Sequence, residues 1–228
     1  MKNYLRYYYL YIVYSMIIIN TIPVIWAQDH DPSFFLERSR SQNTRTVIWK
    51  PEKTFRFDNP SEITECPIPE GKWEVDNGTL RAIGGDRNRA ILLHRNVGDP
   101  VCVEFDVTNY ADGEGRLGDI TVLLNSVDGK AFFGHGYALT TASYWNNCTT
   151  FYKRGKPIAR TEYTPVVSGK TYHVILEFNN GHIRYWLDDR IILEAWDERP
   201  LEIDSECWIG IRTWSTLMVV DNVVVKKR

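Results

Sequence analysis

The sequence has little of what zinc sites and redox centres are commonly built from. Its 228 residues contain four cysteines, Cys66, Cys102, Cys148 and Cys207, and no two of them form a CxxC motif. This spacing excludes the usual zinc and thioredoxin-like motifs. In an exported chain, four cysteines can form two disulfides in three connectivities, or can stay as separate buried thiols. Disulfides are therefore one of the two outcomes left open by the sequence, and separate buried thiols are the other.

A strong excess of charge is also missing. Lys and Arg number 27 against 29 Asp and Glu, which gives a net charge of −2. A nucleic-acid partner is therefore not expected, nor is binding to an anionic membrane. The acidic, glycine-rich loop 109–119, NYADGEGRLGD, lacks the spacing of an EF-hand. We expect no cofactor, with a structural Ca²⁺ held by oxygens of this loop as the one alternative.

The sequence shows no amphipathic helix pattern and no tandem repeat. It consists instead of short runs in which apolar and polar residues alternate. WEVDNGTLRAI, residues 73–83, is typical of a hairpin that turns at Asn-Gly. The segment 171–197 predicts a three-stranded meander with turns at Asn180-Gly181 and Asp188-Asp189. About a dozen such strands predict an all-β fold, an antiparallel two-sheet β-sandwich of the jelly-roll type with one concave face.

The N-terminal segment has a different character from the rest. Residues 1–27 combine a basic start, an apolar stretch and a small residue at Ala27, which is typical of a cleaved signal peptide. A retained membrane anchor is the alternative, and it would be the only membrane contact. We expect residues 28–45 to form a linker or N-terminal arm and residues 46–228 to form the jelly-roll domain. The protein is then exported, to the periplasm or the cell exterior.

The run ECWIGIRTW, residues 206–214, raises the question of function. One side of this strand is apolar, with Cys207, Ile209 and Ile211. The other side, turned away from the core, holds Trp208, Arg212 and Trp214. Indoles stack on the C–H face of a sugar ring, and planar donors such as Arg bind its hydroxyls, or a carboxylate in an acidic sugar. The strand therefore indicates a saccharide-binding face; covering a sheet edge is the structural alternative.

A second group of candidates lies in HGYALTTASYWNNCTTFYKRG, residues 135–155. The segment is rich in aromatic and amide side chains and contains Arg154. Two strands joined by the SYWNN segment would bring several of these side chains over one face of a sheet. The alternative is that Tyr137 and Tyr152 belong to the core and that YWNN is a surface turn.

The closing sequence HIRYWLDDRIILEAWDERPL, followed by CWIGIRTWSTLMVVDNVVV, resembles the second half of concanavalin A-like lectin/glucanase jelly rolls. It is most similar to exported bacterial members of unassigned activity that are associated with polysaccharide degradation. The resemblance is good over 130–226 and looser over 46–129. It implies a concave groove that binds a poly- or oligosaccharide. The residues that we expect to bind it are Tyr144, Trp145, Asn147, Arg154, Arg212 and Trp214.

Catalysis is an open alternative. Retaining glycosidases of this superfamily carry a Glu-x-Asp-x-x-Glu strand, whereas here Glu104 and Asp106 are followed by Asn109 in the last position. A polysaccharide lyase needs a group that neutralises a uronate and a Tyr or His that moves the proton. The candidates for a lyase or an unfamiliar hydrolase are His135, Tyr137, Tyr144 and Arg154. A structural or adhesion domain without a sugar site is the third possibility.

Overall fold

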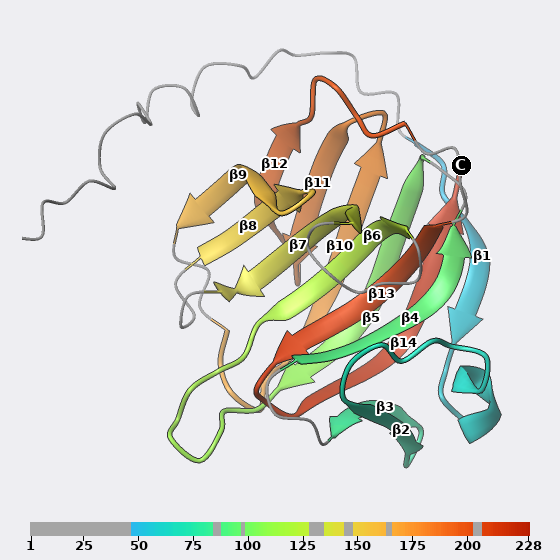
Figure 1. Cartoon of the computed structure of the whole chain (residues 1–228), viewed down its shortest axis with the longest axis vertical. Coiled ribbons are helices and arrows are strands. Elements are labelled where there is room, and N and C mark those ends of the chain that lie inside the picture. The colour runs from blue at the N-terminus through green and yellow to red at the C-terminus, as the bar shows by residue number, and fades with distance from the viewer. Residues whose placement is uncertain are drawn as a thin grey trace, which may run out of the picture. The chain divides into compact units, whose positions relative to one another are not determined.

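The computed structural model describes residues 47–83, 88–96, 99–127, 135–143, 148–162, 166–202 and 207–228. The named elements in these ranges are strands joined by loops and one short 3-10 turn, η2 (Pro60–Ile63) (Figure 1). The strands are β1 (Lys50–Phe55), β2 (Lys72–Asp76), β3 (Thr79–Ile83), β4 (Asn88–Asn96), β5 (Val101–Asn109), β6 (Ile120–Val127), β7 (Tyr137–Ala142), β8 (Cys148–Lys153), β9 (Lys156–Glu162), β10 (Thr171–Asn179), β11 (His182–Leu187), β12 (Arg190–Trp196), β13 (Cys207–Trp214) and β14 (Met218–Lys227).

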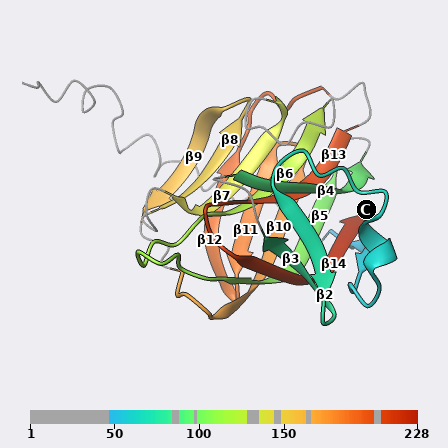
Figure 2. The same ribbon diagram turned by 60° about the horizontal axis from the view of Figure 1, so that its bottom comes forward.

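These strands form two antiparallel sheets that face each other, as the sequence predicted (Figures 1 and 2). Sheet A has eight strands in the order β12-β11-β10-β5-β14-β3-β2, with β1 also paired to β14. Sheet B has six strands in the order β4-β13-β6-β7-β8-β9. Strands from opposite ends of the sequence are therefore neighbours, which is the connectivity of a jelly roll. No helix in the described ranges is long and apolar enough to cross a bilayer.

The predicted hairpins form at the predicted turns. Asn77 and Gly78 take φ values of 50° and 75°, and Asn180 and Gly181 take 50° and 80°. Asn and Gly adopt this left-handed region more readily than other residues, and a two-residue hairpin turn requires it at both positions. The meander 171–197 is thus β10-β11-β12, and its register places Val174 opposite Leu187. The segments 1–27 and 28–45 lie outside the described residues.

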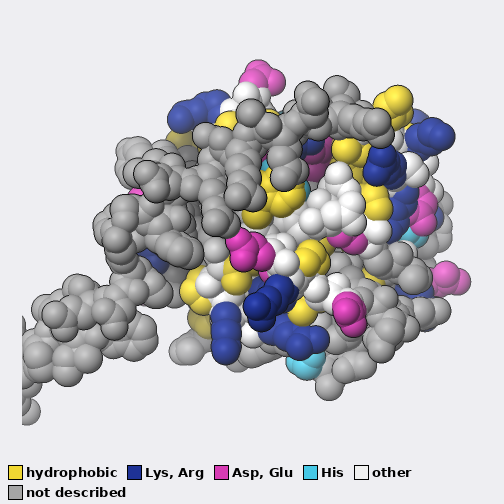
Figure 3. Space-filling view, turned by 90° about the horizontal axis from the view of Figure 1, so that it is seen from above, with side chains coloured by type: hydrophobic (Ala, Val, Ile, Leu, Met, Phe, Trp, Pro, Cys, Tyr) yellow, Lys and Arg dark blue, Asp and Glu magenta, His cyan; other side chains and the backbone are white. Residues whose placement is uncertain are grey.

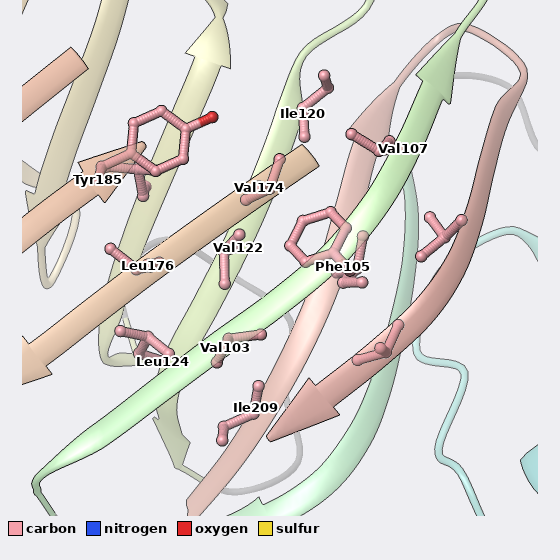
Figure 4. Packing of buried hydrophobic residues seen from close by; sticks show 14 of the residues in the cluster. Val103, Phe105, Val107, Ile120, Val122, Leu124, Val174, Leu176, Tyr185 and Ile209 are labelled. Atoms are coloured by element: carbon pink, nitrogen blue, oxygen red, sulfur yellow. The ribbon is translucent and has the colours of Figure 1, made fainter. Parts of the chain in front are cut away.

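The core lies between the inner faces of the two sheets, where alternate residues of each strand meet. Figure 4 shows Val103, Phe105 and Val107 of β5 packing toward Val122 of β6 and Ile209 of β13. All five side chains are essentially inaccessible to solvent. Burying a large apolar side chain of this kind contributes about 1.5–3 kcal/mol. This contact fixes which residues of sheet B point inward and which point outward.

One end of sheet B is held by a buried amide. The Asn109 Nδ2 atom donates to the Gly118 carbonyl at 2.6 Å, and the Thr216 hydroxyl donates to Asn109 Oδ1 at 2.8 Å. A Cβ atom on Gly118 would lie 2.0 Å from the Trp214 carbonyl oxygen, so only glycine allows this approach. The segment entering β6 is thereby fixed against the turn that follows β13. The Asn that breaks the glycosidase motif has this structural role.

The cysteines correct one expectation. All four are free thiols, and Cys102, Cys148 and Cys207 lie on three strands, β5, β8 and β13, that do not pair with one another. Cys66 follows η2 and is half-buried. Burial raises the pKa of the Cys66 thiol to about 11 and that of Cys102 to about 12. The alternative of separate, unreactive thiols therefore describes the protein, and the predicted disulfides do not form.

Thiol titration tests this assignment. Unfolding in denaturant without reductant is expected to expose four thiols per chain to Ellman's reagent, because no Sγ atom is held in a disulfide. The same titration of native protein is expected to be slow, since three of the thiols are buried and burial raises the pKa of Cys66 and Cys102. A reading of none or two thiols after unfolding would contradict the structure.

Candidate functional site

Sheet B carries a second set of side chains on the face turned away from the core, called here the outer face. It can be assigned because a strand alternates between two sides. Leu123, Ala138 and Trp208 belong to a small cluster separate from the main core, whereas Val122 and Ile209 belong to the main core. The outer face therefore includes every second residue of β4, β13, β6, β7, β8 and β9.

Two rows cross this outer face from strand to strand. The register places polar side chains side by side in one row: Arg212, Thr121, Thr140, Thr150 and Arg160. The next row is apolar and contains Leu92, Gly210, Leu123, Ala138 and Tyr152. The threonines of the first row are at most 2% exposed, and Leu92, Leu123 and Ala138 of the second row are buried as well. The side chains that a sugar ring could contact are therefore the exposed or partly exposed ones beside these rows.

The Arg212 side chain differs from the expectation. It does not lie open in a groove but is buried at 5% exposure. Its Nη1 atom lies 3.1 Å from Asp119 Oδ2, and its Nη2 atom donates to Asn88 Oδ1. The Thr121 hydroxyl lies 3.0 Å from Asp119 Oδ2 and 3.2 Å from Thr140 Oγ1. Arg212 is thus held by protein groups and positions the polar row.

The ion pair also sets the charge of the outer face. Burial raises the pKa of the Asp119 carboxyl, and the Arg212 guanidinium, the Thr121 hydroxyl and the Trp214 backbone N–H offset part of that rise. Because the carboxylate lies against the guanidinium, the positive charge of Arg212 is balanced within the protein. The predicted pairing of Arg212 with a uronate or sulfate would have to compete with Asp119.

Aromatic side chains lie beside both rows. Trp214 is 41% exposed, and the Arg212 guanidinium lies 5.8 Å from its ring centroid. Trp208 and Tyr152 are half-buried and pack against the apolar row, and the Arg95 guanidinium lies 5.0 Å from the Trp208 ring. Trp214 and Trp208 are on the same side of β13, as the alternation predicted.

The other binding candidates are only partly placed. Arg154 is exposed in the turn between β8 and β9, with a positive φ of 48°. It is on the same sheet as Arg212 but three strands across and four residues along, on the order of 20 Å away by strand geometry. The two arginines therefore do not converge on one sugar unit. Tyr144, Trp145 and Asn147 lie outside the described residues.

Tyr137, a catalytic candidate, is a core residue. Its ring stacks with Phe151 at 5.4 Å between centroids. Its hydroxyl donates to Asp197 at 2.8 Å and accepts from the Leu201 backbone N–H at 2.7 Å. Burial raises the pKa of this hydroxyl far above its ordinary value, and Asp197 adds to the rise. A Tyr in this position is a poor proton acceptor at neutral pH.

His135 is half-buried just before β7. Gly136 beside it accepts a hydrogen bond from the Arg154 backbone N–H at 2.8 Å. The two candidates therefore lie at one end of sheet B. Figure 3 looks onto one end of the sandwich and shows Lys, Arg and His side chains gathered at its lower margin. Tyr137 is near them in sequence, but its hydroxyl is engaged elsewhere, so these three do not form a proton-transfer group.

The carboxylates Glu104 and Asp106 lie on β5 of sheet A, on the side away from the core. His173 lies between them, with Nδ1 2.7 Å from Asp106 and Nε2 3.3 Å from Glu104. Lys226 also pairs with Glu104. These carboxylates therefore lie on the opposite sheet from the rows of the outer face, in a network of surface ion pairs.

In the loop 109–119, the Asp112 carboxylate is paired with the Arg116 side chain of the same loop. Asp112 accepts hydrogen bonds from the Glu114 and Arg116 backbone N–H groups, both at 2.9 Å, and from Arg116 Nε at 2.8 Å. The backbone N–H and guanidinium of Arg116 hold the pKa of Asp112 below its usual value. Across the described ranges, no group of three or more His, Cys, Asp or Glu side chains is arranged to hold a metal ion.

Sequence reasoning missed the partners that complete the polar row. Asp119, Thr121 and Leu123 alternate along the segment that enters and forms β6, and Thr140 of β7 is opposite Thr121. The alternation of Asp119, Thr121 and Leu123 was readable and could have marked a polar outer face. The pairing of Arg212 with Asp119 was not, because these residues are 93 positions apart.

Comparison with known proteins adds to this geometry. No known family model matches the chain. Levanase from Bacillus subtilis (strain 168) is 28% identical over 159 residues, which cover 66% of this chain and 22% of levanase. The match thus spans about a fifth of that longer relative.

Two solved structures from Bacillus subtilis have similar folds. The carbohydrate binding module CBM66 has a TM-score of 0.56 and 24% identity, and the match covers 71% of this chain and 95% of that one. A protein of unknown function with a galectin-like fold has a TM-score of 0.63 and 14% identity, with 78% and 97% covered. These likenesses confirm the jelly-roll fold that the sequence predicted.

The buried ion pair can be tested by stability measurements. Arg212→Met leaves the Asp119 carboxylate buried without its cation, so we expect the free energy of unfolding in urea to fall by about 3–5 kcal/mol. Arg212→Met combined with Asp119→Asn removes both charges and is expected to lose less than Arg212→Met alone. The control is Arg160→Met, because Arg160 pairs with Glu162 in solvent, where a change below about 1 kcal/mol is expected. Equal losses for Arg212→Met and Arg160→Met would contradict the pairing.

Proposed function

We propose that this chain is a carbohydrate-binding jelly-roll module and that a polysaccharide lies on the outer face of sheet B. The observation that carries the proposal is the Trp214 indole, 41% exposed on the outer face, with the partly buried rings of Trp208 and Tyr152 on the same face. The similarity to levanase and to the CBM66 module supports it. Such polymers are found outside cells, so we also propose that the chain is exported, as residues 1–27 predict.

The electrostatics favour a neutral saccharide. A uronate or sulfate is bound best by an arginine whose charge is available for a bidentate contact. Here the Arg212 charge is balanced by Asp119 at 3.1 Å, and breaking that pair would leave a buried carboxylate without its cation. The C–H face of a neutral sugar can instead stack on the exposed Trp214 indole without disturbing that pair. Levan, the polymer that the name levanase refers to, is the first candidate ligand.

The geometry supports binding more than cleavage. Glycosidases place two carboxyl groups about 5–10 Å apart on either side of the scissile bond. On the outer face Asp119 pairs with Arg212 and Glu162 pairs with Arg160. The two carboxylates belong to strands that are three positions apart in the sheet, about 14 Å by strand spacing. A lyase or hydrolase of the same fold is therefore the second candidate function.

Binding to a panel of polysaccharides tests the proposal. Trp214→Ala removes the exposed stacking surface, so we expect its affinity for levan, measured by affinity gel retardation, to fall roughly tenfold, about 1.4 kcal/mol. Trp214→Phe is expected to recover part of the loss. The matched control is Tyr110→Ala, which removes an exposed aromatic ring that follows β5 of sheet A and should bind as the unchanged protein does.

The panel should include inulin, a β-glucan and polygalacturonate, with reducing ends and unsaturated products measured in parallel. We expect retardation by a neutral polymer without product formation. Binding that survives Trp214→Ala undiminished would remove the site from this face. Preference for polygalacturonate would contradict the neutral assignment, and release of products would favour the enzymatic alternative.

A further inference from the structure

The outer side of sheet A also exposes apolar side chains, along its edge strand β12. Trp196 is 49% exposed and Ile191 is 50% exposed, whereas most large apolar side chains of the described ranges are buried. Both are on the side of β12 that faces away from the core: Trp196 is opposite His182, and Ile191 is opposite Trp186, on β11. The proposed function does not use this surface.

The Trp196 indole is held as a flat platform. The His182 imidazole lies parallel to it, with 4.1 Å between ring centroids and an angle of 5° between planes. His182 Nε2 is in turn 2.8 Å from Glu194 Oε1. One face of the indole is therefore taken by the imidazole, and the ring is half-exposed to solvent. A ring that is already oriented loses little side-chain freedom when a ligand stacks on it.

The backbone beside Trp196 is fixed as well. The Asp197 backbone N–H donates to the Gly181 carbonyl at 2.8 Å, and a Cβ atom on Gly181 would lie 2.3 Å from the Asp197 carbonyl oxygen. The Asp197 carboxylate is 2.8 Å from Lys153 Nζ and 2.8 Å from the Tyr137 hydroxyl. These contacts stop the end of the edge strand from fraying and hold the platform in place.

The platform continues as a strip along β11 and β12. The strip consists of Trp196, His182, Glu194, Arg184, Trp186 and Ile191. Arg184 is opposite Glu194, and its guanidinium lies 5.2 Å from the Trp186 ring centroid. Five residues of strand separate the two apolar ends, on the order of 16 Å, which is the length of a short oligosaccharide.

The chemistry of the strip matches that of a neutral sugar chain. The aromatic ends offer surfaces for C–H faces, and the Glu194 carboxylate, 52% exposed, offers acceptors for hydroxyl groups. The Arg184 charge is balanced by Glu177. We propose that this strip is a second saccharide-binding site, on the opposite sheet from the first. The inference rests on the proposed function for its ligand class but uses none of the same residues.

Two sites on opposite sheets have a consequence for binding. Each short oligosaccharide molecule binds at one site only, whereas a polymer can be bound at both sites of the module. Attachment through both sites strengthens the hold on the polymer without any new contact. The module would then bind polymeric levan more tightly than either site alone binds a short oligosaccharide.

Titration calorimetry with a levan-derived trisaccharide gives the number of sites. We expect two per chain in the unchanged protein, one in Trp196→Ala, one in Trp214→Ala and none in the double variant. Retention on polymeric levan should fall tenfold or more in Trp196→Ala. Trp196→Phe should keep both sites, and Tyr110→Ala should keep both as the matched control. Trp196→Gln gives a second reading should Trp196→Ala fail to fold.

The outcomes separate the two proposals. One site that is lost in Trp214→Ala and unaffected by Trp196→Ala overturns this inference and leaves the proposed function standing. One site that is lost in Trp196→Ala and kept in Trp214→Ala supports the strip and overturns the site on sheet B. No binding by the unchanged protein to the trisaccharide or the polymer overturns both.

Discussion

The contact between the inner faces of the two sheets determines where every other side chain can lie. Burying Phe105, Val122 and Ile209 against one another commits one side of each strand to the core. The strand period of two then turns the intervening residues outward, and the pairing register aligns them in rows. The threonine row of sheet B and the Trp196 strip of sheet A both follow from this packing. Function on this fold is therefore a property of what the outward rows contain.

Charge balance decides which ligand those rows suit. Buried ion pairs are costly to form and still more costly to break, so Arg212 and Asp119 act as one neutral unit. On sheet A, Arg184 is likewise balanced by Glu177. Aromatic rings beside neutralised arginines offer stacking surfaces without an available positive charge. That combination favours a neutral polysaccharide over a uronate polymer on both faces.

Local patterns predicted the fold well, and distant pairings limited the prediction of the site. The hairpins at Asn77-Gly78 and Asn180-Gly181 were predicted correctly, because two adjacent residues are enough to specify each turn. The alternation around Arg212 gave the correct side of β13. Its burial was missed, because Asp119 is 93 residues away and no local pattern reports that contact. Tyr137 was misjudged for the same reason, since its hydroxyl partners lie beyond position 196.

Both proposed binding sites require that exposed indoles on the outward rows contact sugar. Indole N–H signals of an isotope-labelled chain, followed by nuclear magnetic resonance while a levan-derived oligosaccharide is added, report on each Trp separately. We expect saturable shifts of the Trp214 signal, with the Trp73 signal unchanged because that indole is in the core. An unmoved Trp214 signal at saturating oligosaccharide, or equal movement of Trp73, would contradict this expectation.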